Sequence, residues 1–480
     1  MIDTYDLAPD LRIARVLTGL WQVADMEKDG TTLDREAAAD ALAAYAADGF
    51  TTFDMADHYG SAELITGALL ARGPTPRPLA FTKWCPAPGP MTPDVVRAGV
   101  DERRARLGVE TIDLLQFHWW TFEHPAWLDA LHELTRLREE GVIRSLGVTN
   151  FDAAHLSLAL ADGVPLLTNQ VSFSLLDRRA EADLAAVCAA HGVKLLCYGT
   201  LAGGFLSERW LGRPEPAEIA DWSGMKYRRF IDAAGGWDAY QGVLGAAAQI
   251  GARHGVSIAN VATRWVLDHP HVAGVIVGAR LGEREHRVDN ARLFSFALDA
   301  EDHARLAAAF AATTPLPGDC GDEYRKPPFL TASGDLSHHL ADVPTAHAAE
   351  ATRPGRSRVS SGSVWEDLAG FSRAVRIGDR ILVSGTTATA GTDRVVAPGD
   401  PGAQATYILD KIIGAVRALG GGPEDIVRTR VYLADIDEWE PVSRAHGRVF
   451  ADTKPANTLL AVGGLVGDYR VEIEAEAIVG

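Results

Sequence analysis

FDMADHYG, residues 53–60, comes directly after a short apolar run, and helix-forming sequence resumes after it. It places Asp54 at the predicted end of a strand and Tyr59 in the loop that follows. An acid and a phenol held this close can form part of a proton-transfer site. Taken alone, such a pair is more often a capping carboxylate and a packed loop aromatic, so the rest of the chain has to decide.

Apolar, β-rich runs alternate with helical patterns through the first 295 residues. Continuous apolar strands alternating with amphipathic helices are typical of a parallel sheet buried on both faces. Eight such units predict an α/β fold, a closed (β/α)8 TIM barrel. An open nucleotide-binding sheet is the main rival, but TGLWQV after the first strand lacks its GxGxxG turn. The predicted strands are 14–21, 51–56, 78–84, 112–120, 143–151, 166–173, 193–200 and 273–279.

Polar residues stand where the predicted strands end. A barrel requires this arrangement because its βα loops converge at the C-terminal ends of the strands. Each residue alone fits a snorkelling, capping or packing role, but together they favour a functional site. They are Asp54 and Tyr59 after the second strand, Lys83 on the third, His118 on the fourth, Thr149 and Asn150 on the fifth, Gln170 on the sixth and Tyr198 on the seventh.

The motifs FDMADHYG with SAE after it, FTKW, LLQFHWW, GVTNF, TNQVSFSLL and VGAR resemble those of the aldo-keto reductases, over about residues 10–340. The resemblance implies a carbonyl reductase in which Tyr59 is the general acid. It implies that Lys83, paired with Asp54, lowers the pKa of the phenol, and that His118 orients the carbonyl. A nearby ammonium does favour phenolate, and Asp54 would hold that ammonium in place. The implied cofactor is a nicotinamide nucleotide, which supplies the hydride.

The same resemblance implies where the cofactor binds. The nicotinamide amide would lie against Thr149, Asn150 and Gln170, with its ring on Tyr198. Arg280 would pair with a 2′-phosphate, which favours NADP(H) over NAD(H). NAD(H) stays open because a solvated surface arginine fits the same position. The pyrophosphate would face Gly199, Leu201 and Gly203, and the adenosine end would lie near Gly278, Arg280, His286 and Asn290.

Aromatic residues adjoin the catalytic positions. Trp84, Trp119 and Trp120 are candidates for the substrate pocket, and the long stretch 202–237 is a candidate lid. Aromatic walls suit a sugar or a flat hydrophobic carbonyl compound equally. The same residues also fit a role in packing the barrel rim.

Composition excludes several classes of protein. A net charge of −18 argues against nucleic-acid binding, which depends on clustered Lys and Arg. The chain has no apolar run long enough for a membrane span, and its first residues lack the pattern of a secretion signal. The four cysteines are scattered without CxxC spacing. We therefore expect a cytoplasmic protein with reduced thiols and no metal site.

The organisation changes after the barrel. We assign residues 1–343 to the barrel domain, whose polar end, 318–343, is expected to wrap the barrel as an extension. Residues 344–363 are rich in Ala, Ser, Arg, Pro and Gly and are interpreted as a linker. Residues 364–480 predict a smaller α+β domain. Its predicted elements are a hairpin at 371–389, helices at 401–421 and 438–452, and strands at 427–436, 457–465 and 470–479.

The second domain resembles the RidA (YjgF/YER057c/UK114) family, through RAVRIGDRILVSGTTA, RVYLADI, TKPAN and VEIEAEAI. Glu472 matches the glutamate that positions water in this chorismate-mutase-like fold. Asn457 stands where imine deaminases of the family carry an arginine, so imino-acid hydrolysis is in doubt. The resemblance implies trimers, and we expect this fusion protein to be a homotrimer with the domain as its hub. The alternative is a bifunctional protein whose second domain handles an imine or enamine that the barrel reduces directly or after hydrolysis. A third option is a barrel that binds the nucleotide as a sensor.

Overall fold

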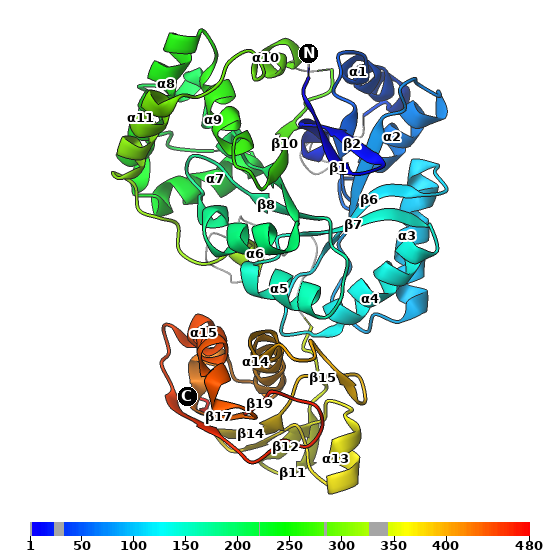
Figure 1. Ribbon diagram of the computed structural model, residues 1–480, viewed down its shortest axis with the longest axis vertical. Helices are drawn as coiled ribbons and strands as arrows, with labels where there is room; N and C mark the ends of the chain where they lie inside the picture. Colours follow the sequence, from blue (N-terminus) through cyan, green and yellow to red (C-terminus); the bar gives the residue numbers. More distant parts are fainter. Residues whose placement is uncertain (1, 24–32, 220, 283–285, 326–343) are drawn as a thin grey trace.

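The chain folds into a closed barrel followed by a smaller domain, in which two main helices lie on a seven-stranded sheet and β15 (Thr389–Ala390) and β16 (Arg394–Val395) form a short two-stranded sheet (Figure 1). The computed structural model describes residues 2–23, 33–219, 221–282, 286–325 and 344–480. Among these residues, no helix is both long and apolar enough to cross a membrane.

Eight parallel strands close the barrel in the order β10-β3-β4-β5-β6-β7-β8-β9. This confirms the predicted (β/α)8 fold, and each predicted run overlaps one of the strands. Nearly all strand residues are buried, as expected where helices cover a parallel sheet. The strands are β3 (Val16–Gly19), β4 (Thr52–Asp54), β5 (Leu79–Trp84), β6 (Ile112–His118), β7 (Ile143–Thr149), β8 (Thr168–Ser172), β9 (Lys194–Tyr198) and β10 (Val272–Gly278).

Helices surround the barrel, and three of them end as their sequences indicate. Gly108, Gly192 and Gly255 take left-handed conformations after α3, α6 and α8, with φ of 65°, 73° and 67°. The helices of this layer are α1 (Arg35–Ala47), α2 (Ala62–Ala71), α3 (Pro93–Leu107), α4 (Ala126–Glu139), α5 (Ala153–Ala161), α6 (Asp183–His191), α7 (Trp222–Ala233), α8 (Gly236–His254), α9 (Ile258–Leu267), α10 (Arg287–Arg292) and α11 (Ala300–Phe310).

An N-terminal hairpin, β1 (Thr4–Ala8) and β2 (Leu11–Ala14), packs onto the apolar barrel interior. Its Leu7 and Leu11 share a buried cluster with strand residues that include Phe81. The sequence analysis did not predict this hairpin: the first predicted strand, 14–21, begins where β2 ends. Since one end of the barrel is filled by packing, the polar residues gather at the other end.

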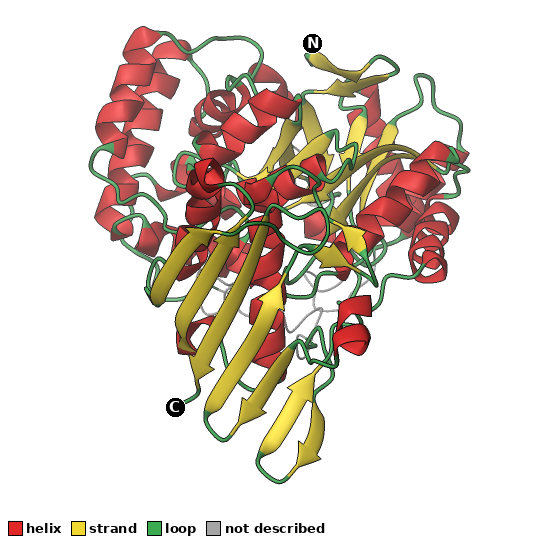
Figure 2. Ribbon diagram, turned by 60° about the horizontal axis from the view of Figure 1, so that its bottom comes forward, coloured by secondary structure: helices red, strands yellow, loops and turns green. Residues whose placement is uncertain are grey.

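The second domain is a seven-stranded sheet with α14 (Pro401–Ala418) and α15 (Trp439–Phe450) on one face (Figure 2). On the other face, Leu382 and Val427 are 42% and 43% exposed. The strand order is β11 (Glu350–Arg353), β12 (Arg356–Val359), β13 (Ala374–Ile377), β14 (Arg380–Thr386), β19 (Val471–Ile478), β17 (Ile426–Leu433) and β18 (Ala456–Ala461).

The segment 344–363 differs from its prediction as a linker. It contains β11 and β12, an antiparallel hairpin that pairs with β13 at the edge of the sheet. All four residues of β11 are exposed. An exposed edge strand carries charged and small polar residues, so it lacks the apolar alternation by which strands are recognised.

The two domains meet where α14 lies against α5 (Figure 1). Arg394 donates to Asp162 at the end of α5 at 2.8 Å, and Arg417 lies 2.5 Å from Glu123. A Cβ on Gly414 of α14 would lie 2.4 Å from the carbonyl oxygen of Glu123. Only glycine allows the two backbones to approach so closely at this point.

Candidate active site

Asp54 and Lys83 form a buried ion pair at the C-terminal ends of neighbouring strands. Lys83 Nζ donates to Asp54 Oδ2 at 2.8 Å and to the carbonyl oxygen of Met55 at 2.9 Å. Each side chain is 4% exposed. β4 and β5 pair in parallel, so both residues reach the same rim of the barrel. The ammonium is thereby fixed beside the loop that carries the candidate acid.

Tyr59 lies in that loop, with Lys83 Nζ 5.0 Å from the centroid of its ring. Burial, reinforced by the carboxylate of Asp54, raises the pKa of Tyr59 well above its ordinary value. This direction is the reverse of the one predicted from the Lys83 ammonium. Asp54 offsets that ammonium at 2.8 Å, and desolvation of the phenolate then dominates. Tyr59 therefore keeps its proton at neutral pH, as a proton donor must.

His118 ends β6, the next strand, and is 4% exposed. Its ring centroid lies 4.5 Å from that of Trp120 and 5.5 Å from that of Tyr324, which it meets edge-on. The parallel pairing of β5 with β6 brings His118 to the rim beside Lys83. The four predicted catalytic residues thus stand on three adjacent strands and their loops.

Two glutamines complete the hydrogen bonding of Asp54. Gln170 Nε2 donates to Oδ1 at 2.7 Å, and Gln116 Nε2 donates to the same atom at 3.1 Å. The family resemblance implied that Gln170 contacts the nicotinamide, whereas in the structure its amide donates to Asp54. Gln116 was not predicted, although it is a lone amide within the apolar run of a fully buried strand.

Three buried hydroxyls at the strand ends make no hydrogen bond among the described residues. They belong to Thr149, Ser172 and Thr200, which end β7, end β8 and follow β9. A buried polar group without a partner is costly, and a bound ligand is one way to satisfy it. The three hydroxyls fit an amide-bearing and phosphate-bearing cofactor along this rim. Ser172 and Thr200 were not predicted.

Asn150 has an unusual backbone for a residue with a side chain. Its φ is 59°, in the left-handed region, where strain is tolerated mainly at functional sites. Its amide oxygen accepts a hydrogen bond from the hydroxyl of Tyr198 at 2.8 Å. Two of the residues predicted to hold the nicotinamide, Asn150 and Tyr198, are therefore in contact.

Gly199, Leu201 and Gly203 form a tight turn after β9, beneath α7. Gly199 and Gly203 have φ of 72° and 64°. A Cβ on Gly199 would lie 2.3 Å from the hydroxyl of Tyr227, and one on Gly203 would lie 2.8 Å from the Tyr227 ring. Glycine is required at both positions, because the side chain of Tyr227 packs directly against the backbone of the turn. α7 belongs to the stretch 202–237 that was predicted as a lid, and it covers this turn.

The residues predicted for the adenosine end lie at the end of β10 and at α10. Gly278 ends β10, Arg280 is exposed two residues later, and His286 is exposed as the N-cap of α10. Asn290 is half-buried within α10, and its backbone N–H bonds to the carbonyl of His286 at 2.8 Å. Residues 283–285 lie outside the described part of the chain.

The three predicted pocket tryptophans have different surroundings. Trp120 lies beside His118. Trp84 packs against α3, where a Cβ on Gly99 would lie 2.4 Å from its indole. Trp119 stacks on Phe117 at 5.7 Å and donates its Nε1–H to the carbonyl oxygen of His124 at 3.0 Å. Of the three, Trp120 alone is in ring contact with a candidate catalytic side chain.

The segment after α11 supplies residues that the sequence did not single out. It forms α12 (Asp322–Arg325), which the buried Arg179 anchors through Glu323 at 2.9 Å. Tyr324 of α12 contacts Lys226 of α7, whose Nζ lies 4.2 Å from the centroid of the Tyr324 ring. The predicted extension thus reaches the barrel mouth, and its remainder, 326–343, lies outside the described residues. Nothing in its polar sequence marked these positions.

Asp57, His58 and Cys85 are the one group of possible metal ligands found in the described part of the chain, with ligand atoms within 4.8 Å of one another. Asp57 already accepts hydrogen bonds from His58 Nδ1 at 2.8 Å and from the backbone N–H of Cys85 at 2.7 Å. Arg103 lies 3.7 Å from the same carboxylate. These partners satisfy Asp57 without a cation.

In the second domain, Asn457 and Glu472 lie on opposite faces of the sheet. Asn457 is paired with Thr429, whose hydroxyl bonds to His446 on α15, so this side chain faces the helices. Glu472 is paired with Tyr432, three residues further along β17 and therefore on the other face. Burial, reinforced by Glu474, raises the pKa of Glu472. The two predicted cleft residues are thus not brought together within one chain.

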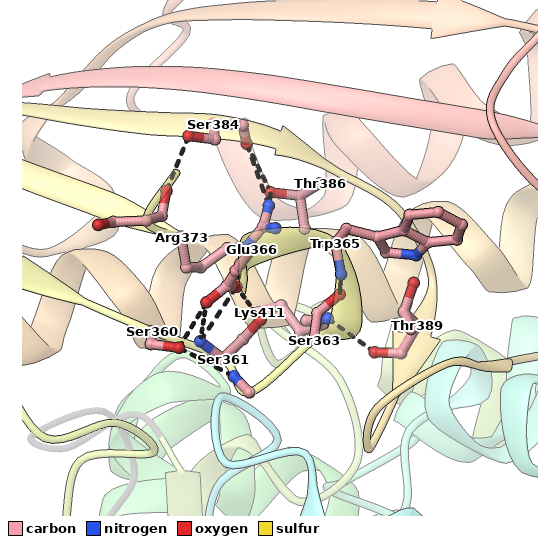
Figure 3. Close-up of polar contacts among 12 residues, drawn as sticks. Ser360, Ser361, Ser363, Trp365, Glu366, Arg373, Ser384, Thr386, Thr389 and Lys411 are labelled. Atoms are coloured by element: carbon pink, nitrogen blue, oxygen red, sulfur yellow. Dashed lines mark hydrogen bonds and ion pairs between the residues drawn. The ribbon is translucent and has the colours of Figure 1, made fainter. Parts of the chain in front are cut away.

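A buried polar cluster behind this sheet was not predicted (Figure 3). Glu366 accepts hydrogen bonds from the hydroxyls of Ser360 and Ser361, both at 2.5 Å, and lies 3.4 Å from Arg373. Lys411 Nζ donates to the carbonyl oxygen of Thr389 at 2.7 Å. Burial, with the charge of Arg373, lowers the pKa of Lys411 to about 7. The cluster ties the segment before α13 (Val364–Ala369) to the domain core.

Comparisons with known proteins agree with both domains. An Endoribonuclease L-PSP family model matches residues 364–479. An uncharacterized protein of Streptomyces coelicolor is 43% identical over 119 residues, covering 25% of this chain and 87% of that protein. The second domain therefore has the predicted RidA-like fold.

For the barrel, Protein tas of Escherichia coli is 32% identical over 205 residues, covering 38% of this chain and 58% of that protein. The structure of a glycerol dehydrogenase from Gluconobacter oxydans has a TM-score of 0.56 and 25% identity, covering 66% of this chain and 98% of its own. The aldo/keto reductase family model matches residues 15–311. The chain belongs to the aldo/keto reductase family.

Proposed function

We propose that this chain reduces an aldehyde, a ketone or a related carbonyl compound with NADPH, using Tyr59 as the general acid. The observation that carries the proposal is the arrangement of Tyr59 over the buried Asp54–Lys83 pair, with His118 on the next strand. The phenol of Tyr59, the ammonium of Lys83 and the imidazole of His118 converge at the C-terminal ends of the strands, because the other end of the barrel is filled by apolar side chains.

The roles follow from the surroundings of each residue. Tyr59 holds a proton up to high pH and would donate it to the carbonyl oxygen of the substrate. Lys83 is anchored by Asp54, so its charge sits at a fixed place as negative charge develops on that oxygen. His118, held beside Trp120, would orient the carbonyl by a hydrogen bond.

The nicotinamide cofactor supplies the hydride when bound. Thr149 and Asn150 would hold its amide, and the turn at Gly199 and Gly203 would face its pyrophosphate. The orphaned hydroxyls along this rim support the assignment. Arg280, exposed at the adenosine end, supports NADPH over NADH because a guanidinium pairs with a 2′-phosphate.

Hydride turnover tests the proposal. NADPH and NADH are titrated by fluorescence into the full chain, and aldehydes, ketones, sugars and cyclic imines are then screened for cofactor oxidation. We expect turnover of at least one carbonyl class, and its loss in Tyr59→Phe. Nucleotide binding without turnover of any class would instead favour a sensor.

We propose further that the second domain is mainly a trimerisation hub. One face of its sheet carries the helices that dock on the barrel, which leaves the other face for neighbouring chains. Exposed apolar side chains on or beside the free face include Leu382, Val427 and Leu460. Light scattering on the full chain tests the proposal, and a monomer would rule it out.

A further inference from the structure

A line of contacts runs from the second domain to the backbone of Asn150 in the barrel. It begins at Asp410 of α14, whose Oδ2 lies 2.9 Å from Nε2 of His155 on α5. The other ring nitrogen of His155 is 2.7 Å from Asp152, the N-cap of α5. All three side chains are nearly inaccessible, with exposures of 8%, 3% and 5% for Asp410, His155 and Asp152. The histidine is thus held between two carboxylates that come from different domains.

The line continues through stacked rings. His155 stacks on Phe122 with ring centroids 3.5 Å apart and planes only 8° apart. The guanidinium of Arg325 lies 4.1 Å from the centroid of the same phenyl ring. Two groups this close to one centroid must occupy opposite faces, so Phe122 is clamped between His155 and Arg325. The guanidinium over one face is favourable because the faces of the ring are electron-rich.

Arg325 then reaches the cofactor end of the barrel. It donates to the carbonyl oxygen of Asn150 and, at 2.8 Å, to that of Trp119. Asn150 has the left-handed backbone described above, and a Cβ on Gly321 would lie 2.2 Å from its carbonyl oxygen. The segment that carries Arg325 is therefore packed tightly onto a strained peptide, whose geometry depends on what holds it in place.

We propose that Asp410 is a positioning residue for the cofactor site, acting through His155, Phe122 and Arg325 on Asn150. The second domain would then hold the cofactor site in its binding geometry, in addition to any role in assembly. The inference rests on the proposed function only in taking Asn150 to contact the nicotinamide. None of the residues in the line except Asn150 needs to touch the cofactor.

The experiment compares NADPH binding by full-length variants, measured by fluorescence titration without substrate. Asp410→Asn keeps the shape of the side chain and removes its charge. Arg394→Gln is the matched control, because it breaks a different interdomain contact, at the C-terminal end of α5, where Arg394 lies 2.8 Å from Asp162. We expect Asp410→Asn to weaken NADPH binding by about 2- to 30-fold, the range of such indirect couplings, and Arg394→Gln to leave it unchanged.

A double-mutant cycle separates positioning from a general loss of structure. If Asp410 acts through Arg325, the effect of Asp410→Asn on NADPH binding disappears in an Arg325→Met background. Additive effects of the two substitutions would overturn the inference, as would equal weakening by Asp410→Asn and Arg394→Gln.

A second readout does not depend on the nucleotide. Amide hydrogen exchange in residues 319–325 should become faster in Asp410→Asn and stay unchanged in Arg394→Gln, and unchanged exchange in both would contradict the inference. If the unsubstituted protein bound no NADPH, the proposed function would fail together with the inference. If the unsubstituted protein bound NADPH and Asp410→Asn bound it equally well, the inference would be wrong and the proposed function would be unaffected.

Discussion

Replacement of Asp54 by asparagine tests whether the buried ion pair organises the site. Three donors converge on this carboxylate: Lys83 at 2.8 Å, Gln170 at 2.7 Å and Gln116 at 3.1 Å. An asparagine offers one oxygen, so either orientation turns its NH2 group toward Lys83 or toward the two glutamines. Lys83, 4% exposed, would keep a buried charge without its carboxylate.

Removing one partner of a buried ion pair costs about 3–5 kcal/mol. At about 2 °C per kcal/mol for a large domain, the melting temperature of the barrel should fall by about 6–10 °C. We expect kcat for carbonyl reduction to fall about a hundredfold or more, because the ammonium beside Tyr59 is no longer anchored. Differential scanning calorimetry of the full chain and steady-state kinetics measure the two effects.

The double variant Asp54→Asn/Lys83→Met decides how the result is interpreted. It removes the buried charge altogether, so it should be more stable than Asp54→Asn alone. Arg305→Gln, which breaks an exposed ion pair with Glu301 on α11, should leave the melting temperature unchanged within error. The reasoning would be refuted if the double variant lost as much stability as the two single variants together. It would also be refuted if the melting temperature of Asp54→Asn fell by less than about 2 °C.

Two further predictions concern pH and cofactor choice. Burial lowers the pKa of His155, but Asp152 and Asp410 outweigh it and raise the pKa in the folded protein. The protonated imidazole therefore stabilises the docked domains fully below the pKa of His155 in the unfolded chain. This stabilisation is lost as the pH rises through the pKa of His155 in the folded protein. The charged groups around this ring are Asp152, Asp410, Arg448 and Arg325. A drop in melting temperature on going from neutral to alkaline pH, absent in His155→Gln, checks this, and equal pH profiles would contradict it. Arg280→Leu should raise the KM for NADPH roughly 10- to 100-fold and spare that for NADH, as expected for a lost charged hydrogen bond. Equal changes with both cofactors would exclude a 2′-phosphate contact.

The barrel could be predicted from sequence because parallel strands buried on both faces leave a strong apolar signal. The rim residues could be predicted because a polar side chain such as Lys83 or His118 is conspicuous at the end of such a run. The pKa direction of Tyr59 could not, since it depends on whether Lys83 or the combination of burial and Asp54 dominates, which only the packing shows.

Other features depend on contacts between distant segments. The hairpin β11–β12 lies at an exposed edge, where polar residues are favoured and the strand pattern disappears. Tyr324 and Arg325 come from a polar segment more than a hundred residues beyond Asn150 and Trp119, and no local pattern indicates that they return to the barrel mouth. The contact of Asp410 with His155 joins two domains, so neither domain's sequence predicts it alone.

The most direct test of the account is the kcat for NADPH-dependent carbonyl reduction in Tyr59→Phe, compared with NADPH binding by the same preparation. Phenylalanine keeps the ring beside Lys83 and removes only the proton donor. We predict that kcat falls about a hundredfold or more while the Kd for NADPH stays within about twofold. Turnover retained in Tyr59→Phe would contradict the assignment of Tyr59 as the general acid.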